Sequence, residues 1–120
     1  MKIAVSSSGK TLDSALDPRF GRAEYFIIVD LETMDFDVVE NSQNFDLPQG
    51  AGIQAAMTIA DHKVDALITG HCGPKAFKVL QSAGIQIMTG ASGKAADVIA
   101  QFKSGELEAA SEPDVEGHWV

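Results

Sequence analysis

Strand-like and helix-like segments alternate along the second half of the chain, and this alternation restricts the fold more than any other feature. In order, the pattern predicts a helix from Gly52, a strand over 64–69, a helix over 74–83, a strand over 85–89 and a helix from Ser92 or Gly93 to near Gly105. In the first helix, an apolar face that we expect to be buried is formed by Ile53, Ala56, Met57 and Ala60. Strands joined by helices pair in parallel, so the pattern predicts an α/β protein.

Three more strands are predicted before residue 41. A strand over 2–7 ends in serines, and an apolar run over 25–29 is followed by a run over 34–39, with Glu32–Thr33 as the hairpin turn. Acidic residues in the last run indicate an edge strand. A hairpin followed by right-handed crossovers predicts a mixed five-stranded sheet in the order 3-2-1-4-5, with helices on both faces.

Length and composition indicate one globular domain with an acidic tail. The 120 residues are 45% hydrophobic and 22% charged, which suffices for one packed core. We expect the domain to span 1–105 and the acidic tail, over 106–120, to be loosely attached. The N-terminal apolar run ends at Ser6, too early for a signal peptide or a membrane-spanning helix, so we expect a cytoplasmic protein. Separately, we expect a monomer rather than an oligomer.

Charge is distributed unevenly along the sequence. The net charge of −8 disfavours nucleic-acid binding, because phosphate contacts need a basic surface. The basic residues in or near the loops after the predicted strands are Lys10, Arg19, Arg22, Lys75 and Lys94. In an acidic protein, such a group would focus positive potential at one mouth, which predicts an anionic ligand.

One motif occurs twice at the predicted binding edge of the sheet. The pattern Thr-Gly-x-x-Gly-x-x-Ala spans 69–76 and 89–96, each time between a strand and a helix. Ligands of open α/β sheets bind beyond the carboxyl ends of the strands. Glycines there allow close backbone approach, and helix starts offer N–H groups to an anion. Either motif alone is explained as a helix-entry turn, but the pair, with the serine-rich loop after the first strand, predicts an anion-binding crevice.

The candidate binding residues of this crevice are Ser7, Ser8, Lys10, Arg19, Phe20, Arg22, Gly70, His71, Cys72, Gly73, Lys75, Gly90, Ser92 and Gly93. Cys72 is also the candidate metal ligand, because a thiolate is stabilised just before a helix start. The alternative is that Cys72 is a small, partly buried residue at a tight turn. A single cysteine excludes an internal disulfide and a thiolate-only zinc site.

Three segments carry a resemblance to a known family. They are residues 17–26, residues 50–56, and the pair 69–70 with 73–77. Together they resemble the dinitrogenase iron-molybdenum cofactor biosynthesis (NifX-like) family, over residues 1 to about 103. The length and the single-domain form are most similar to the orange-protein branch of that family.

The resemblance implies a ribonuclease H-like fold, in agreement with the strand order derived above. It also implies that the domain binds, carries or stores an anionic molybdenum-containing metal-sulfide cluster, a molybdenum-copper sulfide cluster in the orange-protein branch, held without covalent attachment. No catalysis is expected, and other proteins that handle clusters are the implied partners. Family membership does not decide which cluster is bound, because members share a scaffold and differ in cargo.

Other functions explain the sequence less well. A P-loop would require a glycine where this chain has Ala4, and a two-metal nuclease would require carboxylates that the first strand lacks. A thiol enzyme built on Cys72 would need a further partner for His71. The main alternative is a scaffold or regulatory domain that binds a partner protein and no cluster. His118 and Trp119 of the tail are candidates to cover the crevice, but the favoured interpretation of this segment is a mobile chain end.

Overall fold

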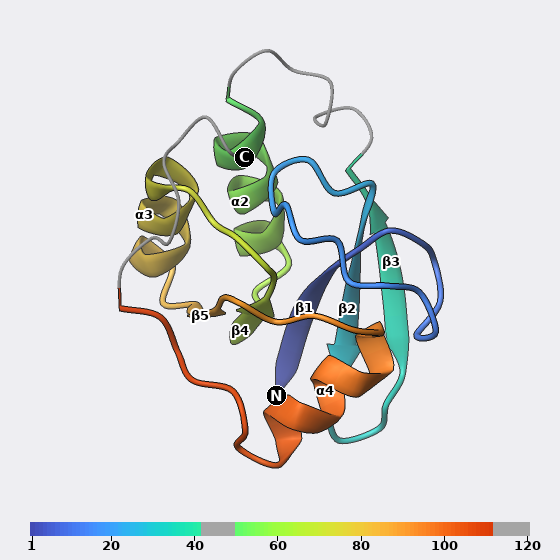
Figure 1. Cartoon of the computed structure of the whole chain (residues 1–120). Coiled ribbons are helices and arrows are strands. Elements are labelled where there is room, and N and C mark those ends of the chain that lie inside the picture. Colours follow the sequence, from blue (N-terminus) through green and yellow to red (C-terminus); the bar gives the residue numbers. More distant parts are fainter. Residues whose placement is uncertain (42–49, 112–120) are drawn as a thin grey trace.

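A single mixed sheet forms the centre of the protein (Figure 1). The computed structural model describes residues 1–41 and 50–111. Its elements are β1 (Lys2–Ser7), β2 (Tyr25–Asp30), β3 (Phe36–Glu40), α2 (Ala51–Asp61), β4 (Ala66–Ile68), α3 (Pro74–Ser82), β5 (Gln86–Met88) and α4 (Ala95–Lys103). The sheet has five strands in the order β3-β2-β1-β4-β5. The predicted order is therefore confirmed.

Strand direction explains where the loops gather. β1 pairs in parallel with β4, and β4 with β5, whereas β2 is antiparallel to both of its neighbours, β1 and β3. The carboxyl ends of β1, β4 and β5 therefore lie at one end of the sheet, and the loops that carry the repeated motif leave from there.

Helices cover both faces of the sheet, as predicted. β1 shows the alternation, because Ala4 belongs to the core under α2 and α3, whereas Ile3 and Val5 belong to the core under α4. Figure 1 shows α2 and α3 next to each other, with α4 separate from them. Each strand of the centre therefore buries side chains on both faces, which is typical of a doubly covered sheet.

The buried face of α2 differs from the predicted one. Ala55, Ala56 and Ile59 are fully buried, whereas Met57 is 50% exposed. The cause is close packing at the start of the helix, where a Cβ on Gly21 would lie 2.7 Å from the Gly52 backbone. Small residues allow that close approach. The face of α2 that contains Gly52, Ala56 and Ile59 therefore points to the core, and Met57 lies at the surface.

The first residues of the acidic tail are attached to the domain. Leu107 and Ala110 pack against the two cores, and the Ala110 N–H donates to the Ile87 carbonyl at 2.7 Å. The loose attachment predicted from residue 106 is therefore wrong for 106–111. The acidic composition of this segment gave no apolar periodicity that would have indicated the packing of Leu107 and Ala110. The rest of the tail, including His118 and Trp119, lies outside the described residues. Within the described part of the chain, no helix has the length and apolarity that crossing a bilayer requires.

Candidate functional site

A segment around Arg19 crosses the carboxyl end of the sheet. The Asp17 N–H donates to the Ser6 carbonyl at 2.9 Å, at the end of β1. Next along the segment, the His71 N–H donates to the Pro18 carbonyl at 2.7 Å, and the Phe20 N–H donates to the His71 carbonyl at 3.2 Å. Arg19 and His71 consequently form a parallel bridge. Two loops that are far apart in the sequence are thus joined at the predicted edge.

The two Thr-Gly turns are joined to each other as well. The Gly90 N–H donates to the Gly70 carbonyl at 2.7 Å. Beneath this contact, the Ser6 hydroxyl lies 2.8 Å from the Thr69 hydroxyl and donates to the Asp17 carbonyl at 2.7 Å. Ser6 and Thr69 are both buried, so these hydroxyl groups fix the ends of β1 and β4. Sequence reasoning did not single out this pair, although serine and threonine at two strand ends were visible in the sequence.

The glycines of the two Thr-Gly turns are required by the local backbone geometry. A Cβ on Gly70 would lie 2.7 Å from the Cα and the carbonyl oxygen of Pro18, so the two backbones could not approach as they do. Gly90 and Gly93 have φ angles of 77° and 112°, which favour glycine. Gly73 is buried and precedes α3 with an extended backbone.

The starts of α3 and α4 differ in what they offer an anion. At α4, the N–H groups of Ala95 and Ala96 already donate to the carbonyls of Ser14 and Leu12, at 2.9 and 2.8 Å. The prediction of available donors at both helices is therefore wrong for α4. A long-range contact with the loop after β1 occupies them.

At α3, the first residue is Pro74, which has no N–H, and no acidic residue lies in the first turn. Across residues 1–41 and 50–111, no acceptor faces the N–H groups of Lys75 and Ala76. Of the starts of α3 and α4, that of α3 is thus the one with N–H groups left over among the described residues, together with the positive end of its dipole.

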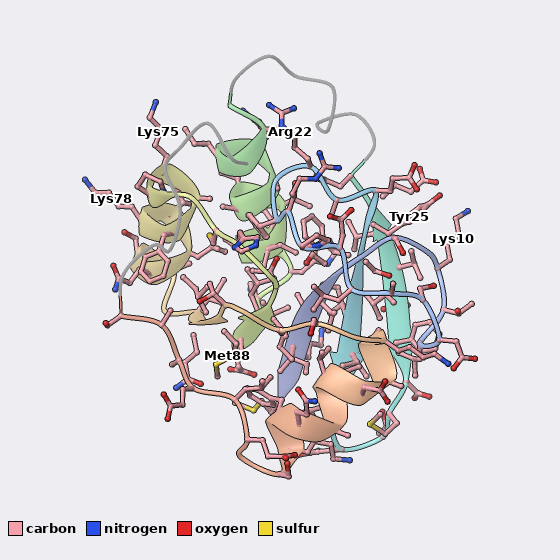
Figure 2. All side chains as sticks on the ribbon, viewed as in Figure 1. Lys10, Arg22, Tyr25, Lys75, Lys78 and Met88 are labelled. Carbon is pink, nitrogen blue, oxygen red and sulfur yellow. The ribbon has the colours of Figure 1, made fainter. Side chains whose placement is uncertain are left out.

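The predicted basic residues do not all lie together. The Lys10 ammonium lies 5.5 Å from the centre of the Tyr25 ring. Figure 2 shows Lys10 and Lys75 extending from opposite sides of the molecule, with Arg22 between them in this view. Lys94 bridges to Ala15 and so lies beside the loop after β1. Arg19 and Lys75 are exposed, and Arg22 is half-buried.

Lys78 was missed by the sequence reasoning. It extends from α3 beside Lys75 (Figure 2), and its spacing of three residues from Lys75 was a signal that could have found it. Lys75 and Lys78 thus lie together on α3, whereas Lys10 extends from the opposite side of the molecule in this view.

Several other candidate residues have structural contacts. The Ser7 hydroxyl is buried and donates to the Gly9 carbonyl at 2.8 Å, and the exposed Ser8 hydroxyl donates to the Ala15 carbonyl at 3.0 Å. Phe20 is fully buried and packs on Phe26, with 5.2 Å between ring centres. Ser92 is exposed at the turn before α4. The buried ring of Phe20 thus anchors the segment around Arg19 to the core.

Cys72 is fully buried in the core under α2 and α3, with its sulfur 3.8 Å from the Gly73 carbonyl. In this conformation its thiol does not reach the surface, so ligation by Cys72 would require the loop to open. Within the described ranges, no three or more His, Cys, Asp or Glu side chains are arranged to hold a metal ion. Among the described residues, this edge of the sheet offers basic side chains and backbone N–H groups.

The family described as "dinitrogenase iron-molybdenum cofactor" matches residues 1–105. The chain belongs to this family. The apo form of the orange protein from Desulfovibrio gigas is similar, with 40% sequence identity, a TM-score of 0.92, and coverage of 95% of this chain and 96% of that chain. The predicted relation to the orange protein is thereby confirmed.

Two further relatives match over most of their length. A candidate NifB protein from Thermotoga has 34% identity and a TM-score of 0.83, with coverage of 97% of this chain and 98% of that one. An uncharacterized protein of Methanocaldococcus jannaschii is 32% identical over 111 residues, which is 90% of each chain. Both relatives thus match nearly the whole length of this chain.

Proposed function

We propose that this protein binds and carries an anionic molybdenum-containing metal-sulfide cluster, of the molybdenum-copper type, and that it does so without catalysis. The family and the similarity to the orange protein support a role connected with a metal cofactor. The observation that carries the proposal is the bridge between Arg19 and His71, because it joins the arginine segment to the turn that leads into α3.

The proposed cluster is held by charge and by N–H donors. The guanidinium groups of Arg19 and Arg22 and the ammonium group of Lys75 supply positive charge, and the N–H groups of Lys75 and Ala76 supply donors at the start of α3. Charge-assisted hydrogen bonds of this kind are stronger than neutral ones, and they require no protein thiolate. The burial of Cys72 is consistent with non-covalent binding.

The remaining candidates take supporting positions in this proposal. His71, Gly70 and Gly73 shape the turn, and Gly90 fixes its neighbour through the bond to Gly70. The other candidates lie at the end of β1, in the loop after it, or in the turn before α4, which contacts that loop. They are Ser7, Ser8, Lys10, Ser92, Gly93 and Lys94.

Reconstitution tests the proposal. Protein mixed anaerobically with tetrathiomolybdate and copper, and then passed through gel filtration, is expected to elute with visible charge-transfer absorption and with both metals bound. Raising the ionic strength should weaken retention, because charge holds the cluster. Colourless, metal-free protein after this treatment would contradict cluster binding.

A scaffold or regulatory role is the second candidate. It is favoured by one observation, the lack of a metal-ligating side-chain group within 1–41 and 50–111. Under this alternative the protein emerges metal-free from reconstitution and binds a partner protein instead, so the same experiment separates the two functions.

A further inference from the structure

The two edges of the sheet differ in how their backbone groups are used. The β5 edge receives a hydrogen bond from the tail, through the Ala110 N–H and the Ile87 carbonyl. On β3, the Asp35 carbonyl accepts from Asp30 at 2.9 Å, and the Asn41 N–H donates to Glu24 at 2.8 Å. Bonding pairs alternate along antiparallel strands, so the odd-numbered residues of β3 face β2.

The even-numbered residues of β3 therefore direct their N–H and carbonyl groups outward. These residues are Phe36, Val38 and Glu40. In the part of the chain that the structure describes, no group bonds to these outward positions. An edge with unused donors and acceptors is a template for one more strand.

All charged residues of the hairpin formed by β2 and β3 are acidic. Between residues 24 and 40 the charged side chains are Glu24, Asp30, Glu32, Asp35, Asp37 and Glu40. A pocket of about 300 Å³ opens on the hairpin beside β3, where Asp30, Asp35 and Asp37 are joined by Ile28, Lys2 and His62. This pocket lies at the amino end of β1, opposite to the end where the cluster is proposed to bind.

The two faces of β3 have different chemistry. Asp37 stands opposite Ile28, on the face that carries α2, and is exposed. Phe36 and Val38 stand opposite Val29 and Ile27, on the face that carries α4, and Phe36 is 40% exposed. Val39 shares the face of Asp37, and Glu40 shares the face of Phe36 and Val38. A strand added beside the first half of β3 would thus meet Asp35 and Asp37 on one face and Phe36 and Val38 on the other.

From this arrangement we propose that the β3 edge binds a partner protein through an extended segment in which cationic and apolar residues alternate. Lysine or arginine at every second position would lie next to Asp37 and Asp35, and the residues between them would pack beside Phe36 and Val38. Strand addition supplies affinity through backbone hydrogen bonds, and the side chains supply selectivity.

A second copy of the chain is a poorer occupant of this edge. Pairing two β3 strands brings two acidic hairpins together with no lysine or arginine between residues 24 and 40 to offset them. Carboxylates on an edge strand are a known protection against self-pairing, and here they leave a cationic strand as the complementary partner.

The test uses metal-free full-length protein, so it is independent of the proposed cluster. The probe is a short, capped peptide of alternating lysine and valine, and a peptide of alternating glutamate and valine is the control. At low ionic strength the lysine peptide should shift the amide resonances of Phe36, Val38 and Glu40 and slow their hydrogen exchange. Its affinity should fall by about tenfold or more at high salt.

Two variants make the test specific. Val38→Pro removes one outward N–H and leaves the bonds to β2 intact, so the fold is retained while peptide affinity falls by about tenfold. Asp37→Lys should weaken binding of the lysine peptide, whereas Asp13→Lys, an equal charge change on an exposed loop, should preserve most of it. Equal affinity for both peptides, or an unchanged affinity in Val38→Pro, would overturn the proposal. Dimerisation of the protein that is lost in Val38→Pro would overturn it in favour of a second copy.

Discussion

Replacing Gly70 with alanine tests the contact that assembles the candidate site. The new Cβ would lie 2.7 Å from the Cα and carbonyl oxygen of Pro18, and backbone atoms cannot move aside as a flexible side chain can. The two segments must therefore separate, which strains the bonds between Pro18, His71 and Phe20, of 2.7 and 3.2 Å. Overpacking of this kind costs about 2 to 3 kcal/mol of unfolding free energy.

For a domain of this size, that loss lowers the melting temperature by roughly 8 to 12 °C, at about 4 °C per kcal/mol. Thermal unfolding followed by circular dichroism measures it. Gly84→Ala is the matched control, because Gly84 has φ 77° and open space around its Cβ position. That variant should lose only about 1 kcal/mol, from backbone strain alone. If Gly70→Ala is no less stable than Gly84→Ala, the close approach does not constrain the site as argued.

Three other predictions concern the proposed site and the buried face of α2. Arg19→Ala should release the reconstituted cluster at lower salt than the wild type, whereas Lys103→Ala, with the same charge change at the far end of α4, should not; equal release by both variants would remove Arg19 from the site. Cys72→Ala should retain the cluster, as measured by bound molybdenum, because the thiol is buried; loss of the metal from a folded variant would restore Cys72 as a ligand. Ile59→Ala should lose about 2 to 5 kcal/mol of unfolding free energy in urea, and Met57→Ala less than about 1 kcal/mol; the reverse order would show that the buried face of α2 is misassigned.

The sheet was predictable from sequence because its determinants are local or general. Apolar runs mark the strands, and the repeated Thr-Gly motif marks where β4 and β5 end. The handedness of crossover connections then leaves few arrangements, and the order 3-2-1-4-5 is one of them. The family could also be recognised, because its motifs are specific in combination.

The details that sequence could not give depend on contacts between distant segments. The buried face of α2 is set by the approach of Gly21 to Gly52, which periodicity does not encode. The donors of α4 are occupied by the carbonyls of Ser14 and Leu12, in the loop after β1, so the start of α4 is not available to an anion. Lys10 was grouped with Lys75 because both follow strands, but the loop after β1 directs Lys10 to Tyr25.

The most direct test of the account is the metal content and visible spectrum of the protein isolated under anaerobic conditions. The account predicts bound molybdenum and copper in a fixed ratio, with a visible absorption band that co-elutes with the protein. A colourless protein that contains neither metal, from cells supplied with both, would contradict the claim that this edge of the sheet carries a metal-sulfide cluster.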